Sequence, residues 1–298
     1  MINQKCEICN IGKYFLKYSG PIRNGSFGNN IKGDIFRCNN CNVERLDEKL
    51  CFNEKDYKNE NYRFKLNQKL DLKTYHQNHD HINFINFDVV NKFLLRDKFI
   101  ADVGCAGGSF LDLVKNITKK SIGIEPNNKF YNHLKKKGYE VYSSLDQANL
   151  YKKKLDLITS FQVIEHVQNP VKFLLEIKTL LKENGKIILS TPNLDDILLE
   201  TLDDYKLFFY RVVHRWYFNK KSIKFCAEKA GLKLEKIIFT QKYGFSNFLL
   251  WIRDRSPTGY KKLDFVDTTM NEFWKSYVEL NQKSDTIYIV LSKENNKG

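Results

Sequence analysis

Long apolar segments are missing from this sequence. Although 42% of its 298 residues are hydrophobic, no uninterrupted apolar run approaches the roughly 18 to 20 residues that a membrane-spanning helix requires. The opening MINQKCEIC lacks the apolar core of a signal peptide, and we find no internal repeat or long low-complexity tract. These absences exclude a membrane span and predict a globular, cytoplasmic protein with enough apolar material for a packed core.

An arginine-rich stripe with interleaved aromatic residues is also missing. The 49 lysines and arginines outnumber the 35 aspartates and glutamates, which gives a formal charge of +14. A charge of this size can mark an anionic partner such as RNA, a nucleotide-linked substrate or a membrane surface. Because the lysines occur in short runs beside asparagines, we expect most of the charge to be solvated surface.

The seven cysteines do not form the pattern of a disulfide framework. Four of them make two C-x-x-C pairs, Cys6 with Cys9 and Cys38 with Cys41. Two such pairs complete a tetrahedral zinc site, whereas a redox dithiol would require only one pair. The surrounding segment has few apolar clusters, so we expect a structural zinc to hold it together, with a disordered or hairpin-like insertion between the pairs. The other cysteines are predicted to be packing residues: Cys51, Cys105 and Cys226.

Short apolar runs alternate with amphipathic stretches from residue 99 onward. Strands are predicted at residues 99–103, 121–124, 140–142, 155–160 and 186–190, and helices at 109–116, 127–137 and 170–182. A helical pattern over 62–96 precedes them, and a helix at 220–230 and strands at 232–240 and 286–292 follow. This alternation predicts an α/β fold with a parallel sheet, helices on both faces and an active site at the carboxyl ends of the strands.

The chain is predicted to contain three parts. These are a zinc-binding module over residues 1–60, a helical lead-in over 61–97 and a main domain over 98–298. Within the main domain, residues 193–220 form an insertion that is expected to cover the acceptor, and residues 243–282 add further C-terminal elements. The sequence does not indicate an oligomeric state.

A glycine-rich turn follows the first predicted strand of the main domain. Asp102 precedes the turn, which contains Gly104, Ala106 and Gly108, and glycine there lets the backbone approach a ligand closely. Glu125, in Gly-Ile-Glu-Pro at the end of the second strand, can accept both ribose hydroxyls of a nucleoside. The turn lacks the G-x-G-x-x-G pattern of dinucleotide dehydrogenases, which argues against that class.

Three ordered motifs resemble those of the class I methyltransferase family: Asp-Val-Gly-Cys-Ala-Gly-Gly at 102–108, Gly-Ile-Glu-Pro at 123–126 and LDLITSFQVIEHVQNP at 155–170. The resemblance implies a Rossmann-like fold with a seven-stranded, mainly parallel sheet and S-adenosylmethionine (SAM) as cofactor. It implies that the Gly104 turn faces the methionine part of SAM and that Glu125 holds the ribose. Ala106 stands where the family usually has a glycine, and we expect slight crowding without loss of binding. The other cofactor-binding residues implied are Asp102, Gly108, Pro126, Phe161, Gln162 and, near the adenine, Ser144 and Leu145.

The segments 35–41 and 57–63 resemble the N-terminal zinc module of methyltransferases that act on nucleotide-linked sugars and surface-glycan precursors. This resemblance implies a small-molecule acceptor, a sugar or nucleotide-linked sugar used in carbohydrate biosynthesis. The alternative is an RNA methyltransferase with a zinc-ribbon recognition module, since zinc modules and high positive charge also occur in enzymes that hold RNA. The absence of a clear stripe of aromatic residues beside arginines argues against RNA. A third reading, an inactive cofactor-binding scaffold, is disfavoured by the intact motif residues.

A histidine just past the fourth predicted strand is the candidate general base. His166 would lie at the rim where the transferred methyl group points, and histidine suits proton removal near neutral pH; the alternative is that it only packs against the following turn. Glu165 either orients His166 or acts as the base itself. His214, among the arginines and aromatic residues of the insertion, is a candidate for acceptor binding. Surface exposure, rather than a role in a lid, is expected for Tyr75, His76, His79 and His81.

Overall fold

The computed structural model describes residues 2–59 and 71–294 and divides the chain into two compact units. The first unit is built from Met1–Cys51, Thr191–Phe225 and Ile237–Tyr288, and the second from Phe52–Ser190, Cys226–Lys236 and Ile289–Gly298. Residues 60–63 of the N-terminal resemblance and residues 62–70 of the predicted helical lead-in lie outside the described residues.

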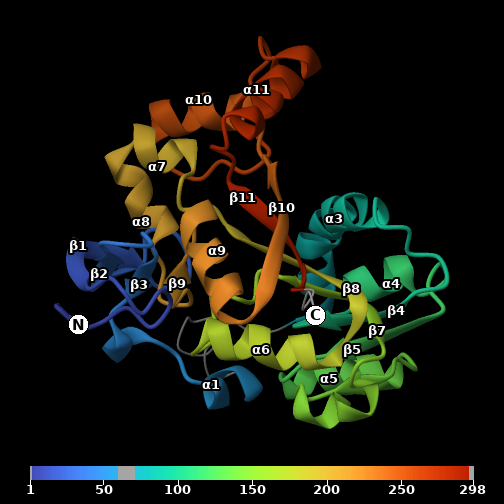
Figure 1. Ribbon diagram of the computed structural model, residues 1–298. Coiled ribbons are helices and arrows are strands. Elements are labelled where there is room, and N and C mark those ends of the chain that lie inside the picture. The colour runs from blue at the N-terminus through green and yellow to red at the C-terminus, as the bar shows by residue number, and fades with distance from the viewer. Residues whose placement is uncertain (1, 60–70, 295–298) are drawn as a thin grey trace. The chain divides into compact units, whose positions relative to one another are not determined.

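A seven-stranded sheet confirms the predicted α/β fold (Figure 1). Its strands lie in the order β10-β11-β8-β7-β4-β5-β6, and the pairs β4 with β5, β4 with β7, β5 with β6 and β7 with β8 are parallel. The bounds are β4 (Phe99–Val103), β5 (Lys120–Ile124), β6 (Val141–Tyr142), β7 (Leu155–Phe161), β8 (Leu181–Pro192), β10 (Leu232–Thr240) and β11 (Thr286–Lys293). Strands buried on both faces explain the continuous apolar runs of the sequence, because helices cover a parallel sheet on both sides.

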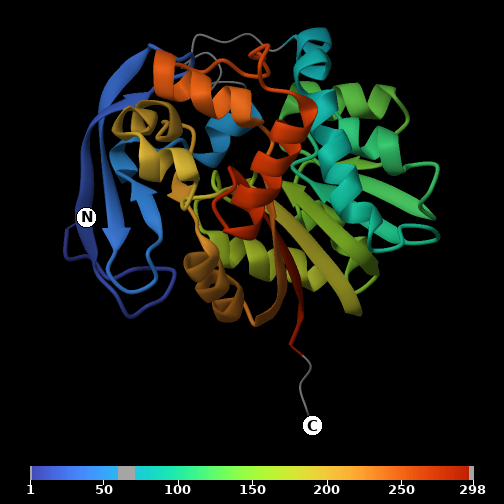
Figure 2. The same ribbon diagram turned by 90° about the horizontal axis from the view of Figure 1, so that it is seen from above.

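The helices between these strands begin where the sequence offers a capping side chain. Asn127 caps α5 (Asn128–Lys136), and Asn169 caps α6 (Pro170–Leu180), in which Pro170 occupies the first turn. Asp71 caps α3 (Leu72–Asn91), which packs against α4 (Ser109–Val114) (Figures 1 and 2). Right-handed crossovers place α4 and α5 on one face of the sheet and α6 on the other.

The order of the strands reverses between β4 and β7. From β4 the chain moves outward through β5 to β6, and then returns to place β7 on the other side of β4. In open α/β sheets, ligands bind at the carboxyl ends of the strands at such a switch point. The sheet topology therefore predicts a ligand site at the turns that follow Val103 and Phe161.

The first unit contains a four-stranded antiparallel sheet in the order β1-β2-β3-β9. β1 (Tyr14–Arg23) and β2 (Asn30–Cys38) form a hairpin, so the segment between the two cysteine pairs is hairpin-like rather than disordered. β3 (Glu44–Leu46) joins them to β9 (Trp216–Tyr217). The predicted insertion thus supplies a strand to the N-terminal sheet, with Trp216 fully buried in the core.

Short helices complete this unit: α7 (Ile197–Thr201), α8 (Lys206–Phe209), the start of α9 (Lys220–Lys229), α10 (Phe245–Asp254) and α11 (Thr268–Leu280). α8 lies beside β1 (Figure 1). The described residues also form α1 (Glu54–Lys58) in the second unit and short 3-10 helices at Glu48–Leu50, Asp146–Tyr151 and Asp203–Tyr205. Among the described residues, no helix has the length and apolar character needed to cross a bilayer.

Candidate active site and metal centre

The turn between β4 and α4 has the backbone conformation that its glycines allow. Gly104 and Gly108 have φ angles of +76° and +83°, in the region that favours glycine. A Cβ atom on Gly104 would lie 2.4 Å from Val163, and one on Gly108 would lie 2.4 Å from Leu134. The Gly104 amide also donates to the carbonyl oxygen of Ile124 at 2.7 Å. The turn is thereby held against the segments that follow β5 and β7.

Ala106 occupies the same turn with a φ angle of +45°. An L-residue in the left-handed region lowers the stability of the folded state by roughly 1–2 kcal/mol. Glycine removes this strain, but its greater conformational freedom in the unfolded chain offsets part of the gain. We therefore expect Ala106→Gly to raise the free energy of unfolding by about 1 kcal/mol, measured by urea denaturation. Ala101→Gly, in the middle of β4, is the control and should lower it; equal destabilisation by both variants would contradict the strain at Ala106.

Glu125 lies at the end of β5 with its carboxylate fixed by backbone amides. Its Oε2 accepts from the Ala106 amide and its Oε1 accepts from the Asn127 amide, both at 2.7 Å. These two bonds orient the carboxylate between the glycine-rich turn and the segment after β5. The side chain is buried, and its chemistry fits the two hydroxyls of a ribose.

Asp102 is buried beneath the turn rather than presented to solvent. The Thr159 hydroxyl donates to its Oδ1 at 2.8 Å, and burial raises the pKa of Asp102 to about 7. Thr159 belongs to β7, so this bond joins the two strands that flank the switch point. Asp102 therefore stabilises the glycine-rich turn from beneath. Thr159 takes part in this support, although the sequence motifs did not identify it as a site residue.

Tyr75 and His76 pack against the turn, contrary to the expectation of surface exposure. A Cβ atom on Gly107 would lie 2.7 Å from the Tyr75 ring, and the His76 Nδ1 lies 3.1 Å from the Ser109 hydroxyl. Burial raises the pKa of Tyr75. His79 and His81 are exposed, as expected. In the sequence, the Gly107-Gly108 pair is the one indication of this contact, because Gly107 leaves room for the Tyr75 ring.

The remaining predicted cofactor residues occupy the same edge of the sheet. Phe161 ends β7 and packs edge to face on Phe110 with 5.0 Å between ring centroids. Gln162 follows with a φ angle of +55°, and its amide donates to the Ser190 carbonyl oxygen at 2.9 Å. Partly exposed residues of the turns after β5 and β6 complete the set: Pro126, Ser144 and Leu145.

His166 lies in the turn after β7 and is partly buried. Its Nδ1 lies 3.5 Å from the Tyr57 hydroxyl, and the two rings meet edge to face with centroids 5.9 Å apart. Tyr57 is itself anchored, because its carbonyl oxygen accepts from the Asn127 side chain at 3.2 Å. The adjacent Glu165 is fully buried. Tyr57 was not identified as a site residue from the sequence, since no motif links α1 to a position more than 100 residues later.

His214 belongs to the first unit and is also buried. Its amide donates to the Arg211 carbonyl oxygen at 3.1 Å, and its ring centroid lies 5.9 Å from that of Tyr217. The side chain therefore sits within the aromatic packing of that unit, beside β9.

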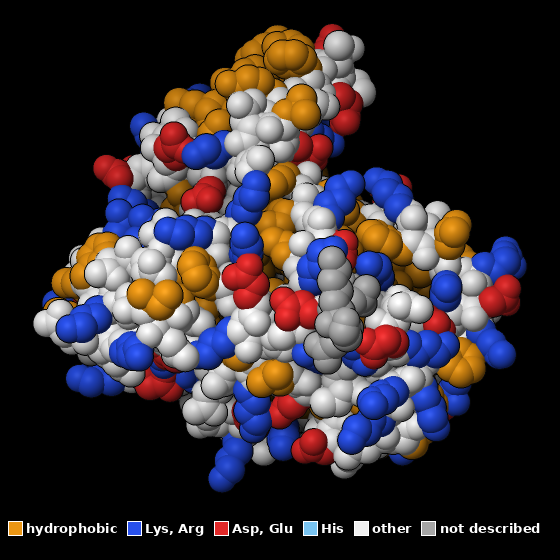
Figure 3. All heavy atoms as spheres, viewed as in Figure 1, with side chains coloured by type: hydrophobic (Ala, Val, Ile, Leu, Met, Phe, Trp, Pro, Cys, Tyr) orange, Lys and Arg blue, Asp and Glu red, His pale blue; other side chains and the backbone are white. Residues whose placement is uncertain are grey.

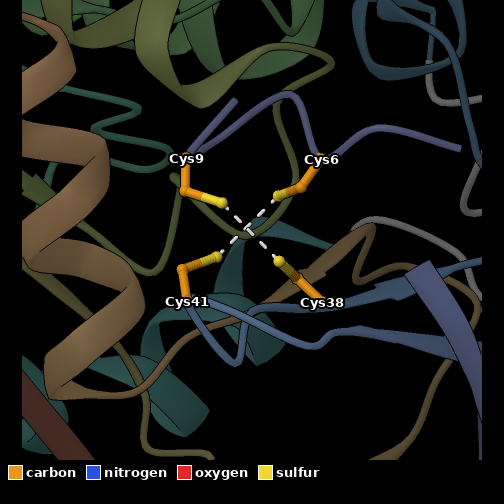
Figure 4. A group of neighbouring side chains, drawn as sticks. All are labelled: Cys6, Cys9, Cys38 and Cys41. Carbon is orange, nitrogen blue, oxygen red and sulfur yellow. Dashed lines mark hydrogen bonds between the residues drawn. The ribbon is translucent and has the colours of Figure 1, made fainter. Parts of the chain in front are cut away.

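The two cysteine pairs converge on one centre (Figure 4). Their four sulfur atoms lie within 4.8 Å of one another, with Cys6 and Cys41 3.8 Å apart and Cys9 and Cys38 3.6 Å apart. A tetrahedral zinc with Zn–S bonds of about 2.3 Å requires sulfur separations of roughly 3.8 Å. The donor set and its spacing fit zinc.

Matched turns position the four thiols. Asn10 and Asn42 each follow a C-x-x-C pair directly and adopt positive φ angles of 57° and 63°, which folds each pair around its centre. The Gly12 amide donates to the Cys9 sulfur and the Asn40 amide to the Cys38 sulfur, each at 3.4 Å. Hydrogen bonding between Cys6 and Cys41 lowers the pKa of Cys6 and raises that of Cys41, so within this pair one thiolate accepts from the other thiol.

Comparison with known proteins identifies the family of the chain. A family model described as a methyltransferase domain matches residues 75–237. Among solved structures, a SAM-dependent methyltransferase from Archaeoglobus fulgidus has a TM-score of 0.51 and 20% identity, covering 72% of this chain and 94% of its own. A possible histamine N-methyltransferase from Thermotoga maritima has a TM-score of 0.50 and 19% identity, covering 74% and 94%. These two likenesses establish the fold.

Curated relatives are named for a reaction on tRNA. A tRNA U34 carboxymethyltransferase of Campylobacter hominis is 33% identical over 123 residues, which are 38% of this chain and 43% of the relative. One of Helicobacter pylori is 28% identical over 195 residues, which are 61% of this chain and 70% of the relative. The Campylobacter hominis match thus spans less than half of that relative's length.

These names contradict the predicted sugar or nucleotide-linked sugar acceptor and the role in carbohydrate biosynthesis. The argument against RNA relied on a linear search for aromatic residues beside arginines. In the folded first unit, the Arg23 guanidinium lies 4.2 Å from the Phe208 ring centroid, and that of Arg45 lies 4.8 Å from the Trp216 ring centroid. Such pairs join segments far apart in the sequence, so a linear search could not find them.

The sheet topology, the glycine turn and the carboxylate after β5 agree with the match to the family model. That match covers more than half of the chain. The chain therefore belongs to the methyltransferase domain family and is a SAM-dependent methyltransferase.

Proposed function

We propose that this protein methylates RNA, with tRNA as the acceptor. The observation that carries the proposal is the shared name of the curated relatives, each a tRNA U34 carboxymethyltransferase. The formal charge of +14 supports it, because phosphate neutralisation by lysine and arginine supplies most of the affinity of nucleic-acid-binding proteins. We also propose that the chain is organised into a zinc-binding module at residues 1–60, a helical lead-in at 61–97 and a main domain at 98–298.

The cofactor-binding edge would hold SAM through the residues at the switch point. Glu125, oriented by two backbone amides, would accept the ribose hydroxyls, and the Gly104 turn would receive the methionine part. Phe161 and Gln162 would flank the nucleoside, with Ser144 and Leu145 beside its base. When bound, SAM supplies a methyl group on a sulfonium leaving group.

His166 is proposed as the general base. Methyl transfer needs alignment of the acceptor and removal of its proton, and a neutral imidazole can take that proton on Nε2 when Nδ1 is engaged elsewhere. The Tyr57 hydroxyl, 3.5 Å from Nδ1, would act as a positioning group for that tautomer. Glu165 beside it is the alternative base, and His214 remains a proposed acceptor-binding residue.

Tyr57→Phe tests the positioning role. The variant keeps the ring that packs on His166 and removes one hydrogen bond, worth about 0.5–1.5 kcal/mol. We expect turnover to fall roughly 2–10-fold and its pH profile to shift, with the KM for SAM unchanged. Tyr131→Phe, a partly buried tyrosine on α5, is the control. An unchanged pH profile and turnover in Tyr57→Phe would remove Tyr57 from the mechanism.

The four-cysteine cluster is proposed to bind a structural zinc ion. The fit of the sulfur spacing supports this assignment, and four protein thiolates would leave no open position for substrate. Zinc would then join the N-terminal turn that carries Cys6 and Cys9 to the end of the hairpin that carries Cys38 and Cys41.

The acceptor class can be tested in cells. Deletion of the gene should remove one modified nucleoside from purified tRNA, detected by mass spectrometry of nuclease digests. Complementation with the intact chain should restore that nucleoside, and complementation with His166→Ala should not. The mass of the lost group distinguishes methyl from carboxymethyl. An unchanged set of tRNA nucleosides after deletion would contradict a tRNA acceptor.

A further inference from the structure

The basic residues are not gathered into one stripe on the visible face of the molecule. Figure 3 shows lysine and arginine side chains scattered there among acidic and hydrophobic ones. A scattered charge attracts RNA without positioning it, because positioning requires specific contacts to phosphates and bases. The contacts of individual arginines in the first unit distinguish such positions.

Several arginines of this unit are neutralised by glutamates. Arg37 pairs with the buried Glu44 at 3.1 Å, and Arg215 pairs with Glu48 at 2.5 Å. Arg45 pairs with Glu48 as well. Within residues 2–59 and 71–294, Arg23 has no carboxylate partner. Its charge is therefore not neutralised by a carboxylate of the described residues.

Backbone hydrogen bonds hold Arg23 next to a second arginine. The Arg23 amide donates to the Tyr210 carbonyl oxygen at 2.9 Å, and the Val212 amide donates to the Arg23 carbonyl oxygen at 3.0 Å. These bonds form a parallel bridge that pairs Arg23 with Arg211. Paired residues of parallel strands project to the same face, so both guanidinium groups lie on one side of the bridge.

The pKa of Arg23 agrees with its position beside Arg211. Partial burial and the neighbouring charge of Arg211 lower the pKa of Arg23 to about 9. An arginine is rarely perturbed in this way, because its guanidinium normally keeps its proton. An anion between the two groups would relieve their repulsion, and two guanidinium forks match the geometry of a phosphate.

Aromatic rings adjoin the arginine pair. The Arg23 guanidinium lies 4.2 Å from the centroid of Phe208 in α8, and Phe208 packs on the buried Trp251 with centroids 5.3 Å apart. Phe27, in the hairpin turn, lies 6.2 Å from Phe208 and is 38% exposed. An exposed ring fixed by other rings is a platform on which a nucleic-acid base can stack.

We propose that Arg23, Arg211, Phe208 and Phe27 form a site for one nucleotide of the RNA acceptor. The arginine pair binds a backbone phosphate, and the exposed face of Phe27 stacks on a base. This inference rests on the proposed RNA acceptor, and it gives the hairpin and the 193–220 insertion a joint role in holding that acceptor.

Arg23→Gln is the first test, with Arg253→Gln as its matched control. Arg253 is in the same unit, is exposed and pairs with its neighbour Asp254, so both variants lose one positive charge. Binding of fluorescently labelled tRNA is measured by anisotropy at several salt concentrations. We expect Arg23→Gln to weaken binding roughly tenfold and to reduce the slope of log affinity against log salt by about 0.7–0.9, as for one lost phosphate contact. Arg253→Gln should change neither quantity appreciably.

Phe27→Ala provides a second test, since its exposed ring can be removed without opening the core. It should weaken tRNA binding roughly tenfold with an unchanged salt slope, because stacking releases no counterions. If the parent protein methylates tRNA while Arg23→Gln and Phe27→Ala bind like Arg253→Gln, this inference is wrong and the proposed function stands. If the parent neither binds nor methylates tRNA, the proposed function itself fails. Tighter binding of a free mononucleotide than of tRNA at this site would also overturn the inference.

Discussion

Replacing Cys38 with serine is expected to abolish zinc binding and to unfold the N-terminal hairpin. The purified parent protein should contain about one zinc per chain, measured by plasma mass spectrometry. Zinc contributes on the order of 10 kcal/mol to the folding of small zinc modules, and serine cannot supply the lost thiolate. The melting temperature of Cys38→Ser should therefore fall sharply, and a chelator should have the same effect on the parent protein.

Cys51→Ser is the matched control for this experiment. Cys51 is a partly buried cysteine of the same unit, and its thiol donates only to backbone carbonyl oxygens, which a serine hydroxyl can also reach. Its zinc content and melting temperature should stay close to those of the parent. A parent protein that is free of zinc yet melts at the same temperature as zinc-loaded protein would refute the metal centre.

Glu125→Gln is expected to weaken SAM binding about 100-fold or more. The carboxylate accepts two backbone amides in this structure, and charge-assisted hydrogen bonds are each worth about 1.5–3 kcal/mol. A glutamine would turn its own NH₂ group toward one of these donors, which also disturbs the turn. Isothermal titration calorimetry with SAM measures the effect directly.

Glu140→Gln makes the same chemical change away from the turn. Glu140 accepts from Tyr142 at 2.6 Å and pairs with Lys120 at 2.8 Å, near the start of β6. Its SAM affinity should match that of the parent. Equal SAM affinity in Glu125→Gln and in the parent would show that the cofactor is held elsewhere.

The fold of the second unit was predictable because its local patterns agree with its tertiary structure. Each strand from β4 to β8 was located, and so were α4, α5 and α6, whereas the short helix at Asp146–Tyr151 was not predicted. The largest difference is β8, which spans Leu181–Pro192 instead of the predicted 186–190. Its first residues are polar and continue directly from α6, so they carry no apolar periodicity from which a strand could be recognised.

The contacts between distant segments were not predictable in the same way. Tyr75 packs on Gly107, and Tyr57 contacts His166, but no local motif marks either partner. The wrong acceptor came from the resemblance of residues 35–41 and 57–63 to sugar methyltransferases. The argument against RNA also missed that Arg23 stacks on Phe208, which lies far away in the sequence. Motifs with fixed spacing predicted the cofactor-binding edge of the sheet and the four-cysteine cluster. Surfaces formed by several distant segments could be recognised only in the folded structure.

Transfer of a labelled methyl group tests directly whether this methyltransferase acts on tRNA. Purified protein is incubated with SAM carrying a labelled methyl group and with either tRNA or a small-molecule extract from cells that lack the gene. We expect label in nuclease-sensitive tRNA, with much less transferred by Glu125→Gln at the same SAM concentration. Label confined to the small-molecule fraction, with tRNA unlabelled, would contradict it.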